Sequence, residues 1–316
     1  MKKIVSLLLT LVMALSLCAC AQAEDAPRLA ALSGPTAMGM AQLLSADGVY
    51  AAADELIPLF TRGEIDIASV PLTVIANLYN NPDIKDENRP LLVAVNTLGV
   101  LYIVEKGSES ISSIEDLRGK TIYATGQGNT PEYALAYLLS QHGMTLGEDV
   151  QVEFKSSPNE ILPLLKSADS AVAMLPQPFV TVAATQVEGL RVALDLTAEW
   201  DSLENGSRFI TSGVMVRAGY AEEHPEEVAA FLESLAASVE FVNTNVEEAA
   251  ALIEELGVVK AAVAQKAIPK CNIVCITGEE MREIVPGYLQ TLLDLDPAVI
   301  RGQLPDDGFY WSADAE

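Results

Sequence analysis

Histidine and cysteine are scarce in this sequence, and their scarcity excludes much of the chemistry that proteins perform. The 316 residues contain two histidines and four cysteines. His142 and His224 have no ligand-like spacing to a cysteine pair, so no zinc site is expected. The candidate loops described below also lack a nucleophile paired with a base. We therefore expect a protein that is not an enzyme, with no catalytic residues, no metal and no cofactor.

Positive charge is scarce as well. Nineteen Lys and Arg residues stand against 44 Asp and Glu residues, which gives a formal charge of −25 at pH 7. Such a surface repels nucleic acid and anionic lipid, so neither is expected as a partner. A cationic ligand does not follow from this charge. The carboxylates gather in helical stretches such as 221–227 and 246–255, where a solvated face explains them.

Long hydrophobic runs are missing except at the start of the chain. Residues 4–17 are apolar but number only 14, fewer than the roughly 20 that a membrane-spanning helix needs. They follow Lys2 and Lys3, which is the pattern of a secretory signal peptide. Residues 1–20 are therefore assigned to export, and the mature protein is expected outside the cytoplasm.

The end of this leader, Leu17-Cys18-Ala19-Cys20, resembles the bacterial lipobox, in which the cysteine becomes the lipid-carrying first residue. Cys20 fits that role because Leu17 lies three places before it and the small Ala19 lies just before it. The sequence predicts a lipid on Cys20, which would anchor the protein to the outer face of the cell membrane. An ordinary secretory signal, cut near residues 21–23, is the alternative.

Two cysteines, Cys271 and Cys275, remain after the leader. A Cys-x-x-x-Cys pair in an exported protein is compatible with a local disulfide. It is equally compatible with two packed or free thiols, and the spacing does not decide between them.

The rest of the chain, about 296 residues, is long enough for two lobes with cores of their own. Short apolar strands alternate with helical patterns as far as 214–216. This alternation predicts an α/β fold in which mixed sheets are flanked by helices. Beyond that point the pattern becomes almost wholly helical.

An internal match supports two similar lobes. Residues 55–71 and 160–176 align without a gap at an offset of 105 and share Glu, Pro, Ala and Pro at equivalent places. Each segment predicts a helix that begins before a proline, a tight turn, a buried strand and a proline that opens the next helix. We interpret the match as one structural unit used once in each lobe.

Small polar residues follow several of the expected strands, at the edge where open α/β sheets bind ligands. These loops are 33–36, 70–73, 96–99, 125–130 and 175–177. The loop 125–130 is the best candidate, and it lacks the Gly-x-Gly-x-x-Gly pattern of dinucleotide sites. Four large side chains line the cleft or belong to the core, namely Met38, Phe179, Trp200 and Phe209. Arg208 either clamps an acidic ligand or lies on the surface.

Several motifs together resemble a known family. Residues 32–39 (Leu-Ser-Gly-Pro-Thr-Ala-Met-Gly) are similar to the opening of substrate-binding proteins of ABC importers, of the nitrate, sulfonate, taurine and thiamine-precursor (THI5-like) type. Residues 64–71, 120–126 and 174–178 resemble further segments of that family in the expected order. The resemblance covers about residues 28–310.

The resemblance implies a two-lobed periplasmic-binding fold of type II that closes about a hinge. It places lobe one at 27–104 plus 213–316 and lobe two at 105–212. The implied partners are a small-molecule ligand, captured between the lobes, and the permease and ATPase of an importer. With Met38 and Gln127 added from their loops, the expected ligand contacts are Gly34, Pro35, Thr36, Met38, Pro71, Thr73, Thr97, Gly126, Gln127, Asn129, Thr130 and Gln177.

Departures from the family leave the ligand open. Ala37 stands where relatives often have a second glycine, and the loops contain no obvious pair of basic residues. A sulfonate or nitrate ligand is therefore in doubt, and a neutral or weakly charged molecule is equally compatible. Two other functions remain as alternatives: a ligand-sensing lipoprotein for a membrane signalling partner, and an enzyme like the one that makes a thiamine precursor.

Overall fold

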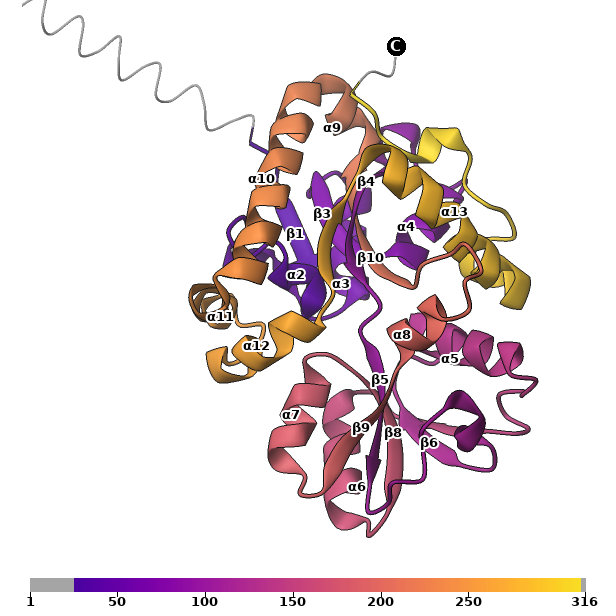
Figure 1. Ribbon diagram of the computed structural model, residues 1–316. Helices are drawn as coiled ribbons and strands as arrows, with labels where there is room; N and C mark the ends of the chain where they lie inside the picture. Colours follow the sequence, from indigo (N-terminus) through magenta and orange to yellow (C-terminus); the bar gives the residue numbers. More distant parts are fainter. Residues whose placement is uncertain (1–25, 314–316) are drawn as a thin grey trace, which may run out of the picture.

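Two mixed β-sheets, each covered by helices, form two lobes stacked one above the other (Figure 1). The structure is a computed structural model that describes residues 26–313. The predicted leader and Cys20 lie outside the described residues. Within 26–313, none of the helices combines the length and the apolar character that crossing a membrane requires.

Lobe one is built on a six-stranded sheet in the order β11-β4-β10-β3-β1-β2. Its strands are β1 (Leu29–Leu32), β2 (Val49–Tyr50), β3 (Ile67–Pro71), β4 (Pro90–Leu98), β10 (Ile210–Arg217) and β11 (Ile273–Ile276). The strand β1 pairs in parallel with β2 and β3, whereas β10 runs antiparallel between β3 and β4. The edge strand β11 was not expected, because its four residues lie within a stretch that otherwise shows a helical pattern.

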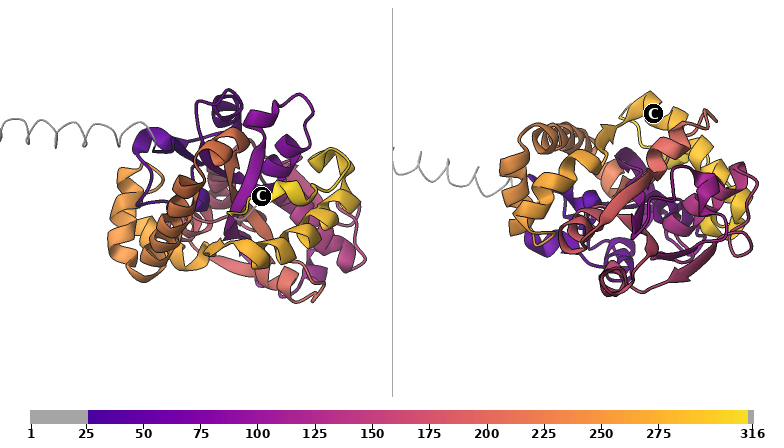
Figure 2. Two further views of the ribbon diagram at one scale, coloured as in Figure 1. Left: turned by 90° about the horizontal axis from the view of Figure 1, so that it is seen from above. Right: turned by 60° about the horizontal axis from the view of Figure 1, so that its bottom comes forward.

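Helices cover both faces of this sheet, as Figures 1 and 2 show. They are α2 (Pro35–Met38), α3 (Ala53–Thr61), α4 (Leu72–Tyr79), α9 (Ala218–Glu223), α10 (Pro225–Thr244), α11 (Val246–Glu255), α12 (Ala261–Ala267) and α13 (Gly278–Leu295), with short 3₁₀ turns η1 (Ala46–Gly48), η2 (Asp86–Asn88), η4 (Ile268–Lys270), η5 (Pro297–Ile300) and η6 (Asp307–Phe309). Alternate residues of a strand point to opposite faces. Accordingly Ala68 packs in the cluster with α4 and α13, while Ile67 packs in the cluster with α10.

Lobe two is built on a five-stranded sheet in the order β7-β6-β8-β5-β9. Its strands are β5 (Leu101–Lys106), β6 (Thr121–Ala124), β7 (Gln151–Phe154), β8 (Ala171–Pro176) and β9 (Leu190–Asp195). Its helices are α5 (Thr130–Gln141), α6 (Pro158–Ser167), α7 (Phe179–Gln186) and α8 (Leu196–Asp201), with the 3₁₀ turn η3 (Ile114–Leu117). The strand β6 is parallel to β7 and β8, and β5 is antiparallel to β8 and β9.

The internal match corresponds to equivalent units in the two lobes. Residues 55–71 form most of α3 and all of β3, and residues 160–176 form most of α6 and all of β8. The predicted helix, turn and strand are therefore confirmed in each lobe. The expectation for the final proline holds only in lobe one. Pro71 caps α4, whereas α7 begins at Phe179, three residues after Pro176.

The chain crosses between the sheets at Gly99–Val100 and returns between α8 and β10. Leu101 pairs with Pro176, so residues 101–104 belong to the sheet of lobe two, although the sequence analysis placed them in lobe one. Residues 210–212 likewise belong to the sheet of lobe one. Both expected boundaries lie inside strands. The strands on either side of the first crossing, β4 and β5, are separated by only two residues and form one nearly continuous apolar run in the sequence.

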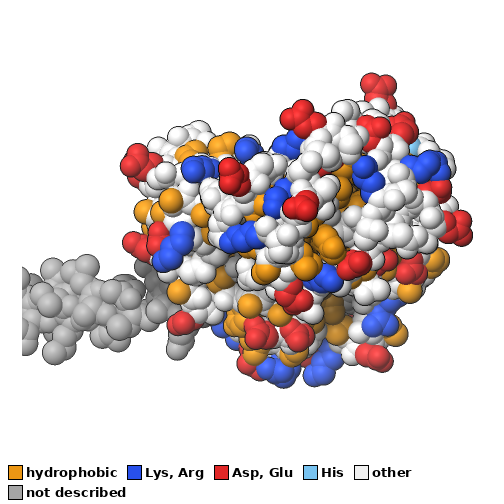
Figure 3. Space-filling model, turned by 90° about the horizontal axis from the view of Figure 1, so that it is seen from below, with side chains coloured by type: hydrophobic (Ala, Val, Ile, Leu, Met, Phe, Trp, Pro, Cys, Tyr) orange, Lys and Arg blue, Asp and Glu red, His pale blue; other side chains and the backbone are white. Residues whose placement is uncertain are grey.

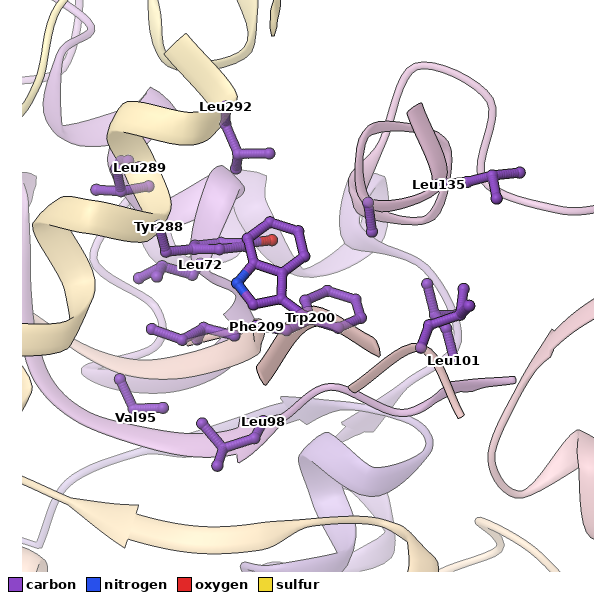
Figure 4. Close-up of a cluster of buried hydrophobic side chains, with 14 of the residues drawn as sticks. Leu72, Val95, Leu98, Leu101, Leu135, Trp200, Phe209, Tyr288, Leu289 and Leu292 are labelled. Carbon is purple, nitrogen blue, oxygen red and sulfur yellow. The ribbon is translucent and has the colours of Figure 1, made fainter. Parts of the chain in front are cut away.

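A hydrophobic cluster joins the lobes beside these crossings (Figure 4). The ring of Trp200, on α8, stacks on Phe209 at a centroid distance of 5.3 Å and lies 5.7 Å from Tyr288 of α13. All three side chains are buried, so Trp200 and Phe209 belong to the core. Met38 is also fully buried in the core of lobe one, whereas Phe179 is half-buried.

Cys271 and Cys275 are free thiols in this structure. Cys271 is the C-cap residue of η4, whereas Cys275 is the third residue of β11, whose extended backbone carries it away from Cys271. Burial raises the pKa of Cys271 to about 12, so its thiol is unreactive at neutral pH. Of the two alternatives that the spacing left open, the structure has the free thiols.

Candidate functional site

The carboxyl ends of the central strands of both sheets face the crossing between the lobes. In lobe one, β1, β3 and β4 end at Leu32, Pro71 and Leu98 on one edge. In lobe two, β6 and β8 end at Ala124 and Pro176, beside the start of β5. The loops that follow these strands therefore converge from two sides, as the positions of small polar residues in the sequence predicted.

A buried polar network fixes the loop after β1. Asn96, on β4, donates hydrogen bonds to Ser69 Oγ at 2.7 Å and to the carbonyl of Thr36 at 3.1 Å. Ser212 Oγ donates to Asn96 Oδ1 at 2.8 Å. The three side chains of this network are fully buried, so breaking it would leave polar groups without partners. The network holds Thr36 against three neighbouring strands, and an asparagine inside the apolar run 91–98 was the available signal for it.

A pocket of about 380 Å³ lies between the lobes. Its volume is within the range of small-molecule sites. Lobe one contributes helix α4 and the turn η5, and lobe two contributes the end of loop 125–130 and the first turns of α5. The lining residues are Thr73, Val74, Asn77, Leu78, Gly128, Asn129, Tyr133, Ala298 and Val299. None of these side chains is charged.

Two helices begin at this pocket, one from each lobe. Thr73 is the second residue of α4, and Asn129 is the N-cap of α5. The first amide groups of a helix have no partner within it and carry partial positive charge. One amide of the loop is already occupied, because Gly128 N donates to the Glu132 carboxylate at 2.6 Å. The pocket therefore combines hydrogen-bonding groups with little net charge.

The wall opposite loop 125–130 comes from the far end of the chain. Asn77 donates to the carbonyl of Val299 at 3.0 Å, and Asn80 donates to that of Ile300 at 2.8 Å. These bonds fix η5 to α4, although the residues lie more than 200 positions apart in sequence. The sequence analysis missed this wall because Ala298 and Val299 carry no local signal of a binding loop.

A hydrogen bond closes one end of the pocket across the lobes. Tyr133 of α5 donates its hydroxyl to Asp296 Oδ2, which follows α13, at 3.1 Å. Burial, together with the hydrogen bond to this carboxylate, raises the pKa of Tyr133 to about 12. The phenol is therefore a neutral donor throughout the physiological range. The sequence analysis did not single out either residue.

The twelve expected contacts fall into groups. Thr73 and Asn129 line the pocket, and Gly126, Gln127 and Thr130 adjoin Asn129 in the same loop. Gly34, Pro35 and Thr36 form the turn tied to Asn96, and Pro71 precedes Thr73. Thr97 and Gln177 are buried at the ends of β4 and β8. Met38 packs beneath this turn in the core and does not reach the pocket.

Arg208, the one basic residue that the sequence analysis singled out, is paired with an acidic side chain. Arg208 forms an ion pair with Asp201 at 3.4 Å, and the two side chains are 43% and 42% exposed. It therefore has the character of a surface residue. On the face seen in Figure 3, basic and acidic side chains are interspersed among hydrophobic ones and form no single-sign patch. Within residues 26–313, no cluster of three or more potential metal ligands is present.

Comparison with known proteins gives a consistent relationship. A family model described as "ABC transporter, phosphonate, periplasmic substrate-binding protein" matches residues 37–267, which is more than half of the chain. None of the curated proteins that were compared matches the chain.

Solved structures share the fold over nearly the whole length. An ABC transporter protein from Parabacteroides distasonis is 24% identical, with a TM-score of 0.75 over 92% of this chain and 99% of the other. The periplasmic aliphatic sulphonate binding protein SsuA from Escherichia coli is 17% identical, with a TM-score of 0.71 over 92% and 93%. The desulfurization enzyme DSZB is 13% identical, with a TM-score of 0.62 over 90% and 96%. The expected two-lobed α/β fold is thereby confirmed.

Proposed function

The chain belongs to the family of periplasmic substrate-binding proteins of phosphonate ABC transporters, and we propose that it captures its solute in the pocket between the lobes. It is the substrate-binding component of an ABC importer, so its partners are a small molecule and a permease. We further propose that the closed, loaded form is what the permease and its ATPase receive.

The observation that carries this proposal is that both lobes line one pocket. Thr73 and the turn η5 belong to lobe one, whereas Asn129 and Tyr133 belong to lobe two. A solute that contacts both walls binds better when the lobes are together, and this difference in affinity drives closure. The chain crosses between the lobes at Gly99–Val100 and again before β10, and these two crossings form the hinge about which the lobes move.

We propose a small, polar, neutral or weakly charged molecule as the ligand. The pocket walls offer Thr73 and Asn129 as hydrogen-bonding side chains, whereas the amide of Asn77 is already bound to Val299 and Arg301. No Lys or Arg is among the lining residues. A strongly charged oxyanion would here depend on helix amides alone, without an ion pair. The family description and the sulphonate-binding neighbour nevertheless make phosphonates and sulfonates the first compounds to compare.

The test is a thermal-shift and native mass-spectrometry screen of the mature protein. The panel contains alkylphosphonates, alkylsulfonates, nitrate, pyrimidines and thiamine precursors. A ligand at 100 times its dissociation constant adds about 2.7 kcal/mol of stability, which gives a readable shift. Isothermal calorimetry at two salt concentrations then separates the classes, because binding of a neutral ligand is nearly independent of salt. Tight, salt-sensitive binding of phosphonates alone would reject the neutral ligand.

Site variants locate the bound molecule. Asn129→Ala and Thr73→Val each remove one hydrogen-bonding group from the wall, and each is expected to weaken binding about tenfold. Thr121→Val, at the exposed start of β6, serves as the control and should leave affinity unchanged. Native affinity in both wall variants would place the ligand elsewhere, for instance at the turn 34–36.

We also propose that Cys20 carries a lipid, on the basis of the lipobox resemblance. Expression in a bacterial host with labelled palmitate should label the wild-type protein and not Cys20→Ser. The labelled protein should partition into the detergent phase, and the variant should remain aqueous. If both proteins are labelled equally, the lipid is on Cys18 and not on Cys20. If neither is labelled, the protein carries no lipid. The relation to the nitrate, taurine and thiamine-precursor branch remains a prediction.

We propose binding without turnover, although one structural neighbour is named an enzyme. The support is the uncharged pocket wall, in which the phenol of Tyr133 stays protonated and already donates its hydrogen bond to Asp296. Incubation of any ligand found in the screen with excess protein, followed by mass spectrometry, tests this directly. Recovery of a chemically altered compound would make the protein an enzyme.

A further inference from the structure

One face of α5 contacts both the other lobe and the hinge. Tyr133 and Tyr137 are four residues apart, so they lie on the same side of the helix. The ring of Tyr137 packs on Trp200 at a centroid distance of 4.5 Å, beside the return crossing, whereas Tyr133 binds Asp296 one helical turn further from it. The Tyr133–Asp296 bond is therefore the contact of the two that lies nearer the pocket and farther from the pivot.

Asp296 serves two structures at once. It follows α13, and its Oδ1 accepts a hydrogen bond from Ala298 N at 3.0 Å, which caps η5. Its Oδ2 accepts the Tyr133 hydroxyl. Ala298 and Tyr133 both line the pocket, and η5 is held to α4 by Asn77. One carboxylate thus connects the pocket wall of lobe one to the pocket wall of lobe two.

We propose that Tyr133 is a positioning residue for ligand capture, whose hydroxyl holds the lobes closed over the pocket through Asp296. The bond joins groups on different lobes, so it exists only while the lobes are together and stabilises that state alone. A hydrogen bond to a carboxylate is among the stronger ones in proteins. This inference rests on the proposed function, because it concerns closure over the same pocket.

The Tyr133–Asp296 bond predicts a specific pattern of ligand affinities. The apparent dissociation constant of a ligand that needs the closed state varies inversely with the closed fraction. Loss of the Tyr133 hydroxyl therefore weakens every ligand of the pocket by the same factor. Loss of a group that touches the ligand, such as Asn129, instead weakens different ligands by different factors. The comparison separates positioning from direct contact.

The first experiment measures the lobes without any ligand. Spin labels are attached at Glu55→Cys on α3 and Glu153→Cys on β7, two exposed positions in different lobes, in a Cys275→Ser background. Tyr133→Phe keeps the ring and removes the hydroxyl, and it should lengthen the mean distance between the labels. Tyr310→Phe is the matched control, because Tyr310 pairs with Leu92 near the opposite end of β4. An unchanged distance distribution in Tyr133→Phe overturns the proposal.

The second experiment is a double-mutant cycle with Asp296→Asn, which retains an oxygen to cap η5. Each single variant should weaken binding of every hit from the ligand screen by about tenfold, mainly through faster dissociation, and the double variant should weaken it no further. Additive effects, or factors that differ between ligands, would make Tyr133 a direct contact.

The two experiments keep the two proposals distinguishable. A longer distance between the labels in Tyr133→Phe, combined with an empty ligand screen, supports the bond across the lobes and counts against the proposed function. Unaltered affinity in Tyr133→Phe for a confirmed ligand overturns the positioning role and leaves the proposed function in place.

Discussion

Buried carboxylates anchor the ends of the sheets that face away from the pocket. Asp66, just before β3, binds Arg28 and Arg217 at 2.6 and 2.9 Å. Glu105, near the far end of β5, is bound by Arg191 and by the serines of the following turn. Both carboxylates are almost completely inaccessible. These buried ion pairs thus hold structure at the ends of the sheets away from the pocket, and no charged side chain is among the residues that line the pocket.

Glu105 gives a prediction at the scale of one residue. Burial by itself raises the pKa of this carboxyl, but hydrogen bonds from Ser108, Ser110 and Arg191 outweigh it and lower the pKa to about 2. A depressed pKa contributes stability above the unfolded value of about 4.5, and this contribution is lost as pH falls from there to 2. At pH 7, Glu105→Gln should cost about 2–3 kcal/mol.

Urea unfolding of both proteins at a series of pH values measures the effect. The difference in unfolding free energy should be constant above pH 5 and should shrink steadily towards pH 2. Glu153→Gln is the control, since Glu153 forms only an exposed pair with Lys155 and should cost less than about 0.5 kcal/mol. A difference that stays constant down to pH 2 would refute the assigned pKa.

Individual site residues differ in how far the sequence could foretell them. The positions of Thr73 and Asn129 at the pocket could be predicted, because small polar residues directly after a strand lie at the edge where α/β sheets bind ligands. Their contact with a ligand stays a prediction. Tyr133 could not be predicted, because its role depends on Asp296, 163 positions later. Asn96 was visible as a polar residue in an apolar strand, but its partners Ser69 and Ser212 come from other strands and only the fold unites them.

At the scale of elements, local sequence patterns predicted most strands and helices but not the order in which the strands lie side by side in each sheet. The strand at 121–124 and the repeated helix–strand units follow from residue periodicity, which is a local property. The pairing of β10 between β3 and β4 joins segments more than 110 residues apart, and no local pattern encodes it. The lobe boundaries failed to emerge from sequence for the same reason, since a crossing is defined by the pairing on either side of it.

The first crossing between the lobes requires a residue without a Cβ atom at position 99. A Cβ atom on Gly99 would lie 2.3 Å from Thr197 Oγ1 and 2.4 Å from Phe209 Cδ1. Gly99→Ala should therefore force the crossing apart and cost about 1–3 kcal/mol, as overpacking does elsewhere. It should also alter the distance between the lobes, because the displaced atoms lie at the crossings that connect them.

Thermal unfolding and the spin-label distances described above measure these two effects. Removing one of the obstructing atoms with Thr197→Ala should restore part of the lost stability in the double variant Gly99→Ala/Thr197→Ala. A Gly99→Ala protein with wild-type stability and an unchanged distance between the lobes would show that the crossing has room to spare.

At the scale of the whole molecule, the two lobes share one hydrophobic cluster. It includes Leu72 of lobe one and Leu101 of lobe two, together with the rings of Trp200, Phe209 and Tyr288 (Figure 4). An apolar core that extends across both lobes couples their unfolding, because neither lobe can unfold without exposing apolar surface of the other to water. Lobe two nevertheless has a separate small cluster around Tyr102 and Leu175, so it retains a partial core of its own.

This arrangement predicts one cooperative unfolding transition for the wild-type protein and two for Trp200→Ala. Truncation of this indole removes the largest side chain between the lobes and should cost about 3–5 kcal/mol. Phe60→Ala removes a buried ring of α3, a helix that packs on strands β1, β2 and β3 of lobe one, and it should cost a similar amount while retaining a single transition. Differential scanning calorimetry compares the calorimetric and van't Hoff enthalpies, which agree only for a single transition. If Trp200→Ala lowers the melting temperature but the two enthalpies still agree, the coupling runs instead through other lobe-to-lobe contacts, such as Tyr102 with the carbonyl of Lys270.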